Sequence, residues 1–253
     1  MHWRRLRNVQ TMSHYGVKVR TGQADVPRSV RNALFKGTYE QHECELVKAH
    51  LRPGDRVLEI GCGIGLVSIL ATKVCGEGNV FSHEANPEME QVIRANYALN
   101  GLTPNLTMRA VTADGRDLTF HRQDNVLSSS IYDRGLGAQQ ITIPSTAIND
   151  ALAAAKANVV IMDVEGAEEE LLPAADLSAV QTMIIEMHPH IIGENRVRAL
   201  CDDLVARGFG LLATRHKTYL FKRPSALTFP ACGPPMSSTS RRMSKGCAIG
   251  PAA

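Results

Sequence analysis

The feature that most constrains this chain is a glycine-rich turn that joins a short apolar strand to a helix. The strand is predicted at 56–60 and the helix at 66–75, because an apolar run stands on each side of the turn. Glycine lets a backbone turn sharply and leaves no side chain between the main chain and a ligand. A strand, a glycine turn and a helix in this order predict an α/β protein that binds a nucleoside. The glycines are Gly61, Gly63 and Gly65.

Two acids near the turn narrow the choice of nucleoside. Glu84 ends the next predicted strand, where it is placed to accept hydrogen bonds from two ribose hydroxyls. Dinucleotide sites space their glycines as Gly-x-Gly-x-x-Gly, so that a helix N-terminus faces a pyrophosphate. The spacing here is Gly-x-Gly-x-Gly, and Glu59 would repel a pyrophosphate but suits the ammonium of an aminocarboxypropyl group. The predicted cofactor is S-adenosylmethionine, and a nicotinamide-dependent oxidoreductase is the alternative enzyme class.

Strands and helices alternate along most of the chain, which is typical of a doubly wound α/β sheet with helices on both faces. The run at 158–163 is apolar until its last residue, as expected of a strand buried on both faces. The last two strands lie too close together for a helical crossover, so they should form an antiparallel hairpin. The strands are predicted at 56–60, 79–84, 105–111, 158–163, 180–187, 209–214 and 217–222, and the helices at 28–51, 66–75, 87–99 and 194–207.

Three segments lie outside this alternation. Residues 1–37 are interpreted as an N-terminal extension to the main domain, which spans 38–223. Residues 114–145 are an insertion after the third strand, placed to form a lid or a substrate wall at the ligand-binding edge of the sheet. Residues 224–253 contain too few apolar residues to fold and are predicted to be disordered. The insertion carries two β-like pieces, at 118–121 and 140–143.

The basic charge of the chain is concentrated at its two ends. The formal net charge is +3, and the basic residues of the two ends outnumber it, so the region between them is acidic overall. The few aromatic residues near these charges do not alternate with them as a stacking platform for bases would require, and we therefore expect no nucleic-acid partner. The basic residues of 1–20 and 223–253, where no acid stands, are Arg4, Arg5, Arg7, Lys18, Arg20, Arg223, Arg241, Arg242 and Lys245.

The composition of the chain also indicates the cellular compartment in which we expect the protein. No apolar run approaches the roughly 18 residues that a membrane span requires, and the basic N-terminus is not followed by the apolar stretch of a signal peptide. The 6 cysteines form no Cys-x-x-Cys pair and have no regular spacing, which is typical of reduced thiols. We expect a cytoplasmic protein with no membrane partner.

Acids and a histidine follow the fourth and fifth strands. Asp163 ends the strand at 158–163, and Glu186 and His188 fall on one face at the end of the strand at 180–187. All three should open into one cleft, with Asp163 facing the sulfonium of the cofactor. His188 or Asp163 is then a candidate base for a substrate hydroxyl, because a neutral histidine with a pKa of about 6.5 can accept a proton.

Other uses of these residues stay open. A set of Asp, Glu and His also suits a metal ion, but nothing in the sequence fixes ligand spacing and no metal is assigned. A histidine at a strand end can instead cap or support a loop. Glu168 and Glu169 are explained by their place in the first turn of a helix, whose N-terminus they stabilise. Ala113 and Asp114 are placed to meet the adenine of the cofactor.

With these pieces in order, residues 38–190 resemble the FkbM family of S-adenosylmethionine-dependent methyltransferases. The most discriminating motif is Asp-Val-Glu-Gly-Ala-Glu at 163–168, placed before a strand that ends Glu-x-His. The chain departs from the family pattern at Ile161, where the family often has lysine, and at 148–149, where it often has Leu-Asp. The other matching motifs are Gly37–Glu40, Val57–Gly65, Glu84–Pro87, Asn96, Asn100–Gly101 and Ile143–Thr146.

The resemblance implies a class I methyltransferase fold, which is Rossmann-like, with a seven-stranded and mostly parallel sheet. It also implies methyl transfer to a hydroxyl of a small acceptor such as a sugar or a polyketide, by in-line displacement on an aligned oxygen. A binding protein that keeps the fold without turnover is a further alternative. The predicted cofactor residues are Glu59, Gly61, Gly63, Gly65, Glu84, Ala113, Asp114 and Asp163, and the predicted catalytic residues are His188, Asp163 and Glu186.

Deletion of residues 224–253 is expected to leave folding and cofactor binding intact, because their composition gives them little apolar surface to bury. The melting temperature of the truncated chain should stay within a few degrees of that of the full chain. A large drop would show that this segment docks on the domain.

Overall fold

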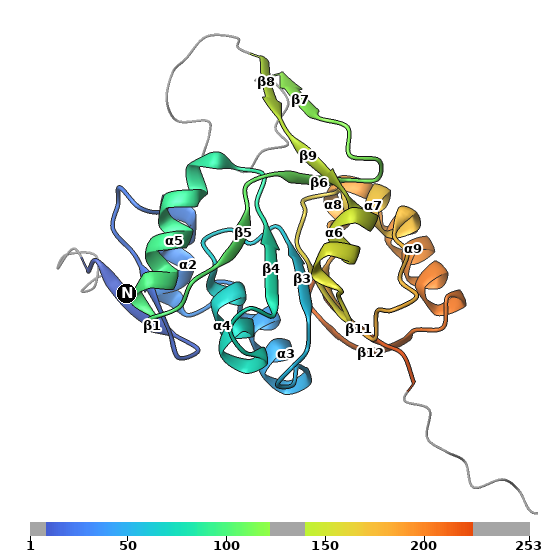
Figure 1. The fold of residues 1–253 in the computed structure, drawn as a ribbon, viewed down its shortest axis with the longest axis horizontal. Helices are drawn as coiled ribbons and strands as arrows, with labels where there is room; N and C mark the ends of the chain where they lie inside the picture. The colour runs from blue at the N-terminus through green and yellow to red at the C-terminus, as the bar shows by residue number, and fades with distance from the viewer. Residues whose placement is uncertain (1–8, 122–139, 225–253) are drawn as a thin grey trace, which may run out of the picture. The chain divides into compact units, whose positions relative to one another are not determined.

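The computed structural model describes residues 9–121 and 140–224, and its centre is a seven-stranded sheet. Neighbouring strands are parallel except at β13, which runs antiparallel to both of its neighbours. The predicted α/β class, the seven strands and the C-terminal antiparallel hairpin are therefore confirmed (Figure 1). In order across the sheet the strands are β12 (Gly210–Arg215), β13 (Thr218–Lys222), β11 (Thr182–Glu186), β10 (Val159–Met162), β3 (Val57–Ile60), β4 (Val80–His83) and β5 (Asn105–Thr107).

Helices cover both faces of the sheet because its central strands are apolar on both faces. In β3 successive side chains alternate, so that Val57 packs into one hydrophobic cluster and Leu58 into the other. In Figure 1 the first group of helices is coloured blue to green and the second group yellow to orange. The first group is α2 (Arg28–Lys36), α3 (Gln41–His50), α4 (Leu66–Cys75) and α5 (Glu90–Leu99), and the second is α6 (Ile148–Ala155), α7 (Glu168–Ala174) and α9 (Glu194–Ala206).

The direction of the strands brings the predicted functional residues to one edge of the sheet. β4, β3, β10 and β11 are successive parallel neighbours, so their carboxyl ends meet on the same side. Ligands of open α/β sheets bind outside these ends. The residues that follow the four strands are, in the same order, Glu84, Gly61, Asp163 and the segment that contains His188.

The single helix expected at 28–51 is wrong, because the chain breaks it into α2 and α3. Gly37 ends α2 in the left-handed conformation, with φ of 77°, which glycine adopts without a Cβ penalty. Glu40 then also has a left-handed backbone, with φ of 47°, and α3 begins at the next residue. The two helices are therefore separated by a short turn at the edge of the sheet where ligands bind.

The strand expected at 105–111 is also two strands. β5 stays in the sheet, whereas β6 (Ala110–Thr112) leaves it and pairs in parallel with β9 (Ser145–Ala147). Arg109 fixes the departure, because its Nε and Nη2 atoms both donate to the carbonyl oxygen of Ser145, at 2.9 and 2.6 Å. The sequence pattern could not show this long-range contact.

A hairpin of β1 (Thr11–His14) and β2 (Val17–Arg20) was not predicted from the sequence. It packs on α4 and α5, and its valines Val17 and Val19 are fully buried in the first cluster. Asn96, also fully buried, joins this hairpin to the glycine turn. Its Oδ1 accepts from the backbone N–H of Arg20 at 2.7 Å, and its Nδ2 donates to the carbonyl of Ile64 at 2.8 Å.

The β-like pieces of the insertion form an antiparallel pair, β7 (Leu118–His121) and β8 (Gln140–Ile143). The segment between them, and residues 225–253 of the predicted disordered tail, lie outside the described residues. Asn86 caps the helical segment that follows β4, and the first turn of this segment is a 3₁₀ turn, Pro87–Met89. None of the described helices has the length and apolar character needed to cross a membrane.

Asn96→Ala is expected to lower the free energy of unfolding by about 2–5 kcal/mol, since it leaves a donor and an acceptor without partners in a buried place. Asn149 is a matched control, because its side chain also bonds one backbone carbonyl and one backbone N–H, but at an exposed position. Asn149→Ala should change the same quantity by less than about 1 kcal/mol, because water can replace both partners. Urea unfolding of the two variants measures the difference, and equal losses would contradict the role given to burial.

Candidate active site

A cavity of about 980 Å³ opens at the carboxyl edge of the sheet. Ligand cavities commonly span roughly 300–1,000 Å³, so this one has room for a nucleoside cofactor and a small second molecule. It reaches from the end of β4 across the glycine turn to the ends of β10 and β11. Residues that line it include Tyr39, Glu40, Gly63, Glu84, Asp163 and Glu186.

Close backbone contacts explain the first two glycines of the turn. A Cβ on Gly61 would lie 1.8 Å from the carbonyl oxygen of Asp163, and both Gly61 and Gly63 have positive φ. A Cβ on Gly63 would lie 2.9 Å from the hydroxyl oxygen of Tyr39. Gly65 does not line the cavity, because its bare backbone faces Ile93 of α5 instead.

Glu84 lines the cavity, as predicted, and it also organises the glycine turn. Its Oε2 accepts from the backbone N–H of Gly63 and its Oε1 from that of Asn86, each at 2.9 Å. A carboxylate has roughly four acceptor sites, so each oxygen can still accept another hydrogen bond. Burial raises the pKa of Glu84, against these backbone hydrogen bonds, which lower it.

Glu59 has a different position from the predicted one. The alternation of β3 directs it beneath α4, where it is 1% exposed and does not line the cavity. Its Oε2 accepts from the hydroxyls of Ser68 and Ser82, the latter at 2.6 Å. Burial raises its pKa to about 7. Glu59 therefore links β3 to α4 and β4 under the turn, and its prediction as a ligand of the cofactor ammonium has no support in this geometry.

Ala113 and Asp114, predicted to meet the adenine, do not line the cavity either. The N–H of Ala113 donates to Oε1 of Glu170 at 2.9 Å, and the exposed carboxylate of Asp114 pairs with Arg116 at 2.8 Å. The preceding residues, 109–112, line the cavity in their place. The split of the third strand shifts which residues face inward, and this shift was not visible in the sequence.

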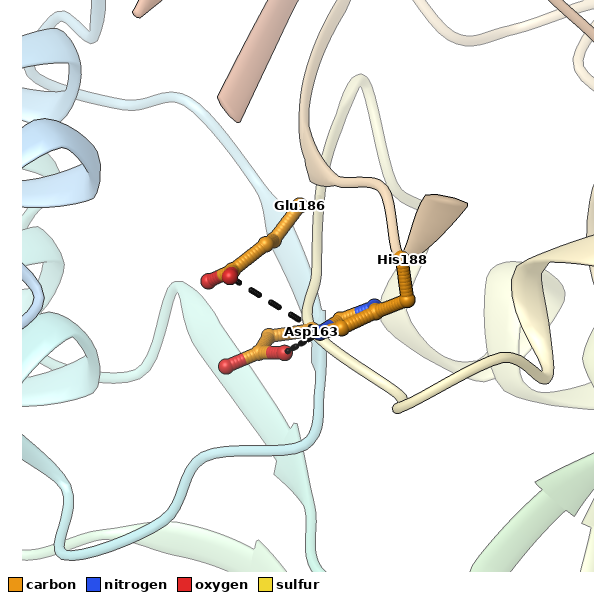
Figure 2. Close-up of side chains that lie close together, drawn as sticks. All are labelled: Asp163, Glu186 and His188. Carbon is orange, nitrogen blue, oxygen red and sulfur yellow. Dashed lines mark ion pairs between the residues drawn. The ribbon is translucent and has the colours of Figure 1, made fainter. Parts of the chain in front are cut away.

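Asp163, Glu186 and His188 come together as predicted (Figure 2). Nε2 of His188 lies 3.5 Å from Oδ1 of Asp163, 3.5 Å from Oε2 of Glu165 and 3.7 Å from Oε1 of Glu186. Asp163 and Glu186 line the cavity, whereas His188 is 2% exposed and does not. The imidazole therefore lies behind the carboxylates.

Glu168 was missed as a functional residue. It is fully buried, and its Oε1 accepts the backbone N–H of His188 at 2.7 Å and lies 3.2 Å from Nδ1 of the same histidine. Its position at the start of α7 was explained from the sequence by the helix N-terminus alone. The only sequence signal was its place in the Asp-Val-Glu-Gly-Ala-Glu motif. A carboxylate on Nδ1 holds the ring so that Nε2 points toward Asp163.

The charges of this cluster shift one another's pKa. Burial, and then the charge of Glu186, raises the pKa of Asp163 far above the range of an ordinary carboxyl group. Burial lowers the pKa of His188, but the hydrogen bond to Glu168 and the charge of Asp163 outweigh it and the pKa is raised. Groups that bind protons near neutral pH are suited to acid–base catalysis.

The same three side chains could also hold a metal ion, since their ligand atoms all lie within 4.8 Å of one another. Oδ1 of Asp163 is shielded from solvent and has no hydrogen-bond partner. Both features fit either a metal ion or a proton shared between the carboxylates, because either one would place a positive charge between them.

The seven-stranded sheet with a cavity at its carboxyl edge agrees with the predicted class I methyltransferase fold. The family comparison is more specific, since residues 60–210 match the model of the methyltransferase FkbM domain. This match covers more than half of the chain, and the chain therefore belongs to the FkbM methyltransferase family. The predicted resemblance is confirmed, and the nicotinamide-dependent oxidoreductase is set aside.

Curated relatives match this chain over short stretches. The ribosomal protein L11 methyltransferase of Burkholderia thailandensis is 39% identical over 56 residues, which are 22% of this chain and 18% of that protein. That of Thermus thermophilus is 33% identical over 85 residues, 32% of this chain and 33% of that protein. This chain thus spans a third or less of these curated relatives.

Among solved structures, magnesium protoporphyrin IX methyltransferase from Synechocystis PCC 6803 with bound SAM is similar at 17% identity and a TM-score of 0.45, over 88% of this chain and 89% of that one. TYW2 of M. jannaschii in complex with AdoMet is similar at 17% identity and a TM-score of 0.43, over 85% of this chain and 86% of that one.

Glu84→Ala is expected to weaken S-adenosylmethionine binding on the order of 100-fold, which is the loss of two hydrogen bonds to a carboxylate at about 1.5 kcal/mol each. Because Glu84 also holds the N–H of Gly63, the variant should melt at a lower temperature while remaining folded. Calorimetry at a temperature where the variant is folded measures the affinity. Unchanged affinity in the folded variant would remove Glu84 from the site.

Proposed function

We propose that the protein transfers the methyl group of S-adenosylmethionine to a hydroxyl group of a small acceptor, such as a sugar, a polyketide or another small metabolite. One observation carries this proposal. Asp163 is a cavity-lining carboxylate with a raised pKa, and it stands next to the glycine turn with His188 behind it. A hydroxyl must lose its proton when it is methylated, and a base of this kind can accept it.

In this proposal different residues contact different parts of the cofactor. Glu84 would hold the ribose, and the bare backbone at Gly61 and Gly63 would lie along the cofactor, where side chains would collide with it. When bound, S-adenosylmethionine supplies an electrophilic methyl group on a sulfonium. In this chemistry the acceptor oxygen would bond to the methyl carbon as the carbon–sulfur bond broke, with its electron pair left on sulfur. Alignment of the three atoms by the cavity accounts for much of the rate.

Asp163 is better placed than His188 to take the proton of the acceptor, since only Asp163 lines the cavity. From the sequence alone, both residues are candidate bases. In this proposal the hydroxyl proton moves to Asp163, and His188 is a positioning residue whose Nε2 lies 3.5 Å from Oδ1 of that carboxylate. Glu168 fixes the orientation of the ring from its far side.

The acceptor is the least constrained part of the proposal. The size of the cavity leaves room for a small molecule beside the cofactor. Two relatives are named for methylation of a ribosomal protein, so a protein acceptor is the main competitor. The expectation that no nucleic acid takes part rests on where the basic residues lie in the sequence and on the aromatic residues near them.

The test is incubation of the full chain with methyl-labelled S-adenosylmethionine and a panel of hydroxylated metabolites, with ribosomal protein L11 and bulk RNA as separate arms. The proposal expects a mass gain of one methylene unit on a hydroxylated metabolite, and unchanged turnover after EDTA dialysis. Label on protein or RNA alone would overturn the small-acceptor proposal. Cofactor binding without transfer in any arm would indicate a non-catalytic protein, and activity lost with EDTA and restored by a divalent ion would indicate a metal.

The charges next to Asp163 should set the pH at which activity falls on the acid side, because protonated Asp163 cannot take the acceptor proton. Asp163→Asn is expected to lower kcat by about 10²- to 10⁴-fold. The charge of Glu186 raises the pKa of Asp163 and that of His188 lowers it. Glu186→Gln should therefore move the acidic limb of the kcat profile to lower pH and His188→Asn to higher pH, each by roughly one unit.

Asn at position 188 keeps an N–H for Glu168 and removes only the atom that faces Asp163, so this variant should fold. The two opposite shifts separate the candidate bases. If His188 were the base, His188→Asn would abolish the acidic limb instead of moving it.

A further inference from the structure

One carboxylate oxygen of the cavity has no partner, and its residue, Glu40, has no assigned role. Oε2 of Glu40 is shielded from solvent and has no hydrogen-bond partner. Glu40 forms no ion pair with any residue that the structure describes. A buried carboxylate oxygen without a partner is costly, which indicates that the partner of Glu40 is a ligand.

The backbone of Glu40 points to the same conclusion. Its φ of 47° and ψ of 34° are left-handed values, which are unfavourable for a residue with a Cβ. Strain of this kind tends to persist at sites that need a side chain in one place. Here it aims Glu40 at the glycine turn, since Oε1 lies 3.3 Å from where a Cβ on Gly63 would stand.

Tyr39 lies beside this carboxylate. Its hydroxyl oxygen is 2.9 Å from where a Cβ on Gly63 would stand, and hydrogen bonding to this hydroxyl lowers the pKa of Glu40, against the effect of burial. Both side chains therefore lie against Gly63, whose N–H donates to the carboxylate of Glu84. A cofactor whose ribose is held by Glu84 would extend its other end toward Tyr39 and Glu40.

A cationic group is the partner that best suits this place in the cavity. Burial raises the pKa of Glu40 well above its usual range, and the charges of Asp163, Glu43 and Glu59 raise it further. A cation in contact with Glu40 would offset this repulsion. Glu59, the residue that the sequence pattern favours for such a contact, is occupied by Ser68 and Ser82 outside the cavity.

We propose that Glu40, positioned by Tyr39, binds the α-ammonium of the aminocarboxypropyl end of S-adenosylmethionine, in place of Glu59. This inference rests on S-adenosylmethionine as the cofactor but not on the acceptor or on the base. It assigns a cofactor contact to the turn between α2 and α3, which the sequence pattern treats as the interior of one helix.

The test compares two ligands of the full chain by calorimetry. S-adenosylhomocysteine carries the ammonium, and 5′-methylthioadenosine shares its adenosine and thioether but lacks the aminocarboxyl group. Glu40→Gln is expected to weaken S-adenosylhomocysteine by about 10- to 100-fold, the range of a charge-assisted hydrogen bond. The affinity for 5′-methylthioadenosine should change by less than about threefold, because that ligand does not reach Glu40.

Two further variants keep the inference open to refutation. Tyr39→Phe should give a smaller loss that is also confined to S-adenosylhomocysteine, and it serves if Glu40→Gln does not fold. Glu59→Gln should not give the selective loss. Equal weakening of both ligands by Glu40→Gln, no change in either, or a selective loss in Glu59→Gln would overturn the assignment. Failure of the wild-type chain to bind either ligand would instead overturn the cofactor.

Discussion

The site depends on how closely the ends of β3 and β10 approach each other. A Cβ on Gly61 would lie 1.8 Å from the carbonyl oxygen of Asp163, so a larger residue would push the two strand ends apart. Because Gly61 begins the cofactor turn and Asp163 is the proposed base, this one backbone contact sets the distance between them. Methyl transfer is sensitive to such distances, since its rate depends on alignment. The parallel pairing of the two strands keeps the contact rigid.

A second constraint is the set of acidic side chains that line the cavity. Burial raises the pKa of four carboxyl groups that line the cavity. Such a lining suits a ligand that carries positive charge, and S-adenosylmethionine carries both an ammonium and a sulfonium. A pyrophosphate would meet repulsion instead. The electrostatics of the cavity therefore agree with the cofactor class indicated by the spacing of the glycines. The four groups are Glu40, Glu84, Asp163 and Glu186.

The sequence predicts those features of the fold and the site that local residue patterns determine. The glycine turn, the strand ends and Glu84 follow from apolar runs and glycine spacing, and the structure has them where they were expected. Glu59 was predicted to contact the ligand because it lies close to the glycine turn in the sequence. The sequence does not show that Ser68 of α4 and Ser82 of β4 bond its side chain. Glu40 stands in the Gly37–Glu40 motif but was given no role, because residues 28–51 were interpreted as one helix and the break at Gly37 was missed. The first error concerns contacts between separate segments, and the second concerns a local helix end.

The arrangement of charge also bears on how the product leaves. In the proposed reaction the sulfonium would become a neutral thioether, so the ligand would lose one positive charge while the carboxylates around it remained. In the proposed mechanism Asp163 gains the acceptor proton in the same step, which removes one negative charge from the cavity. His188 lies 3.5 Å from that carboxylate, and Glu168 is buried behind it. Return of the proton to solvent would restore the negative cavity, and a cationic cofactor would then bind it more favourably than the neutral thioether.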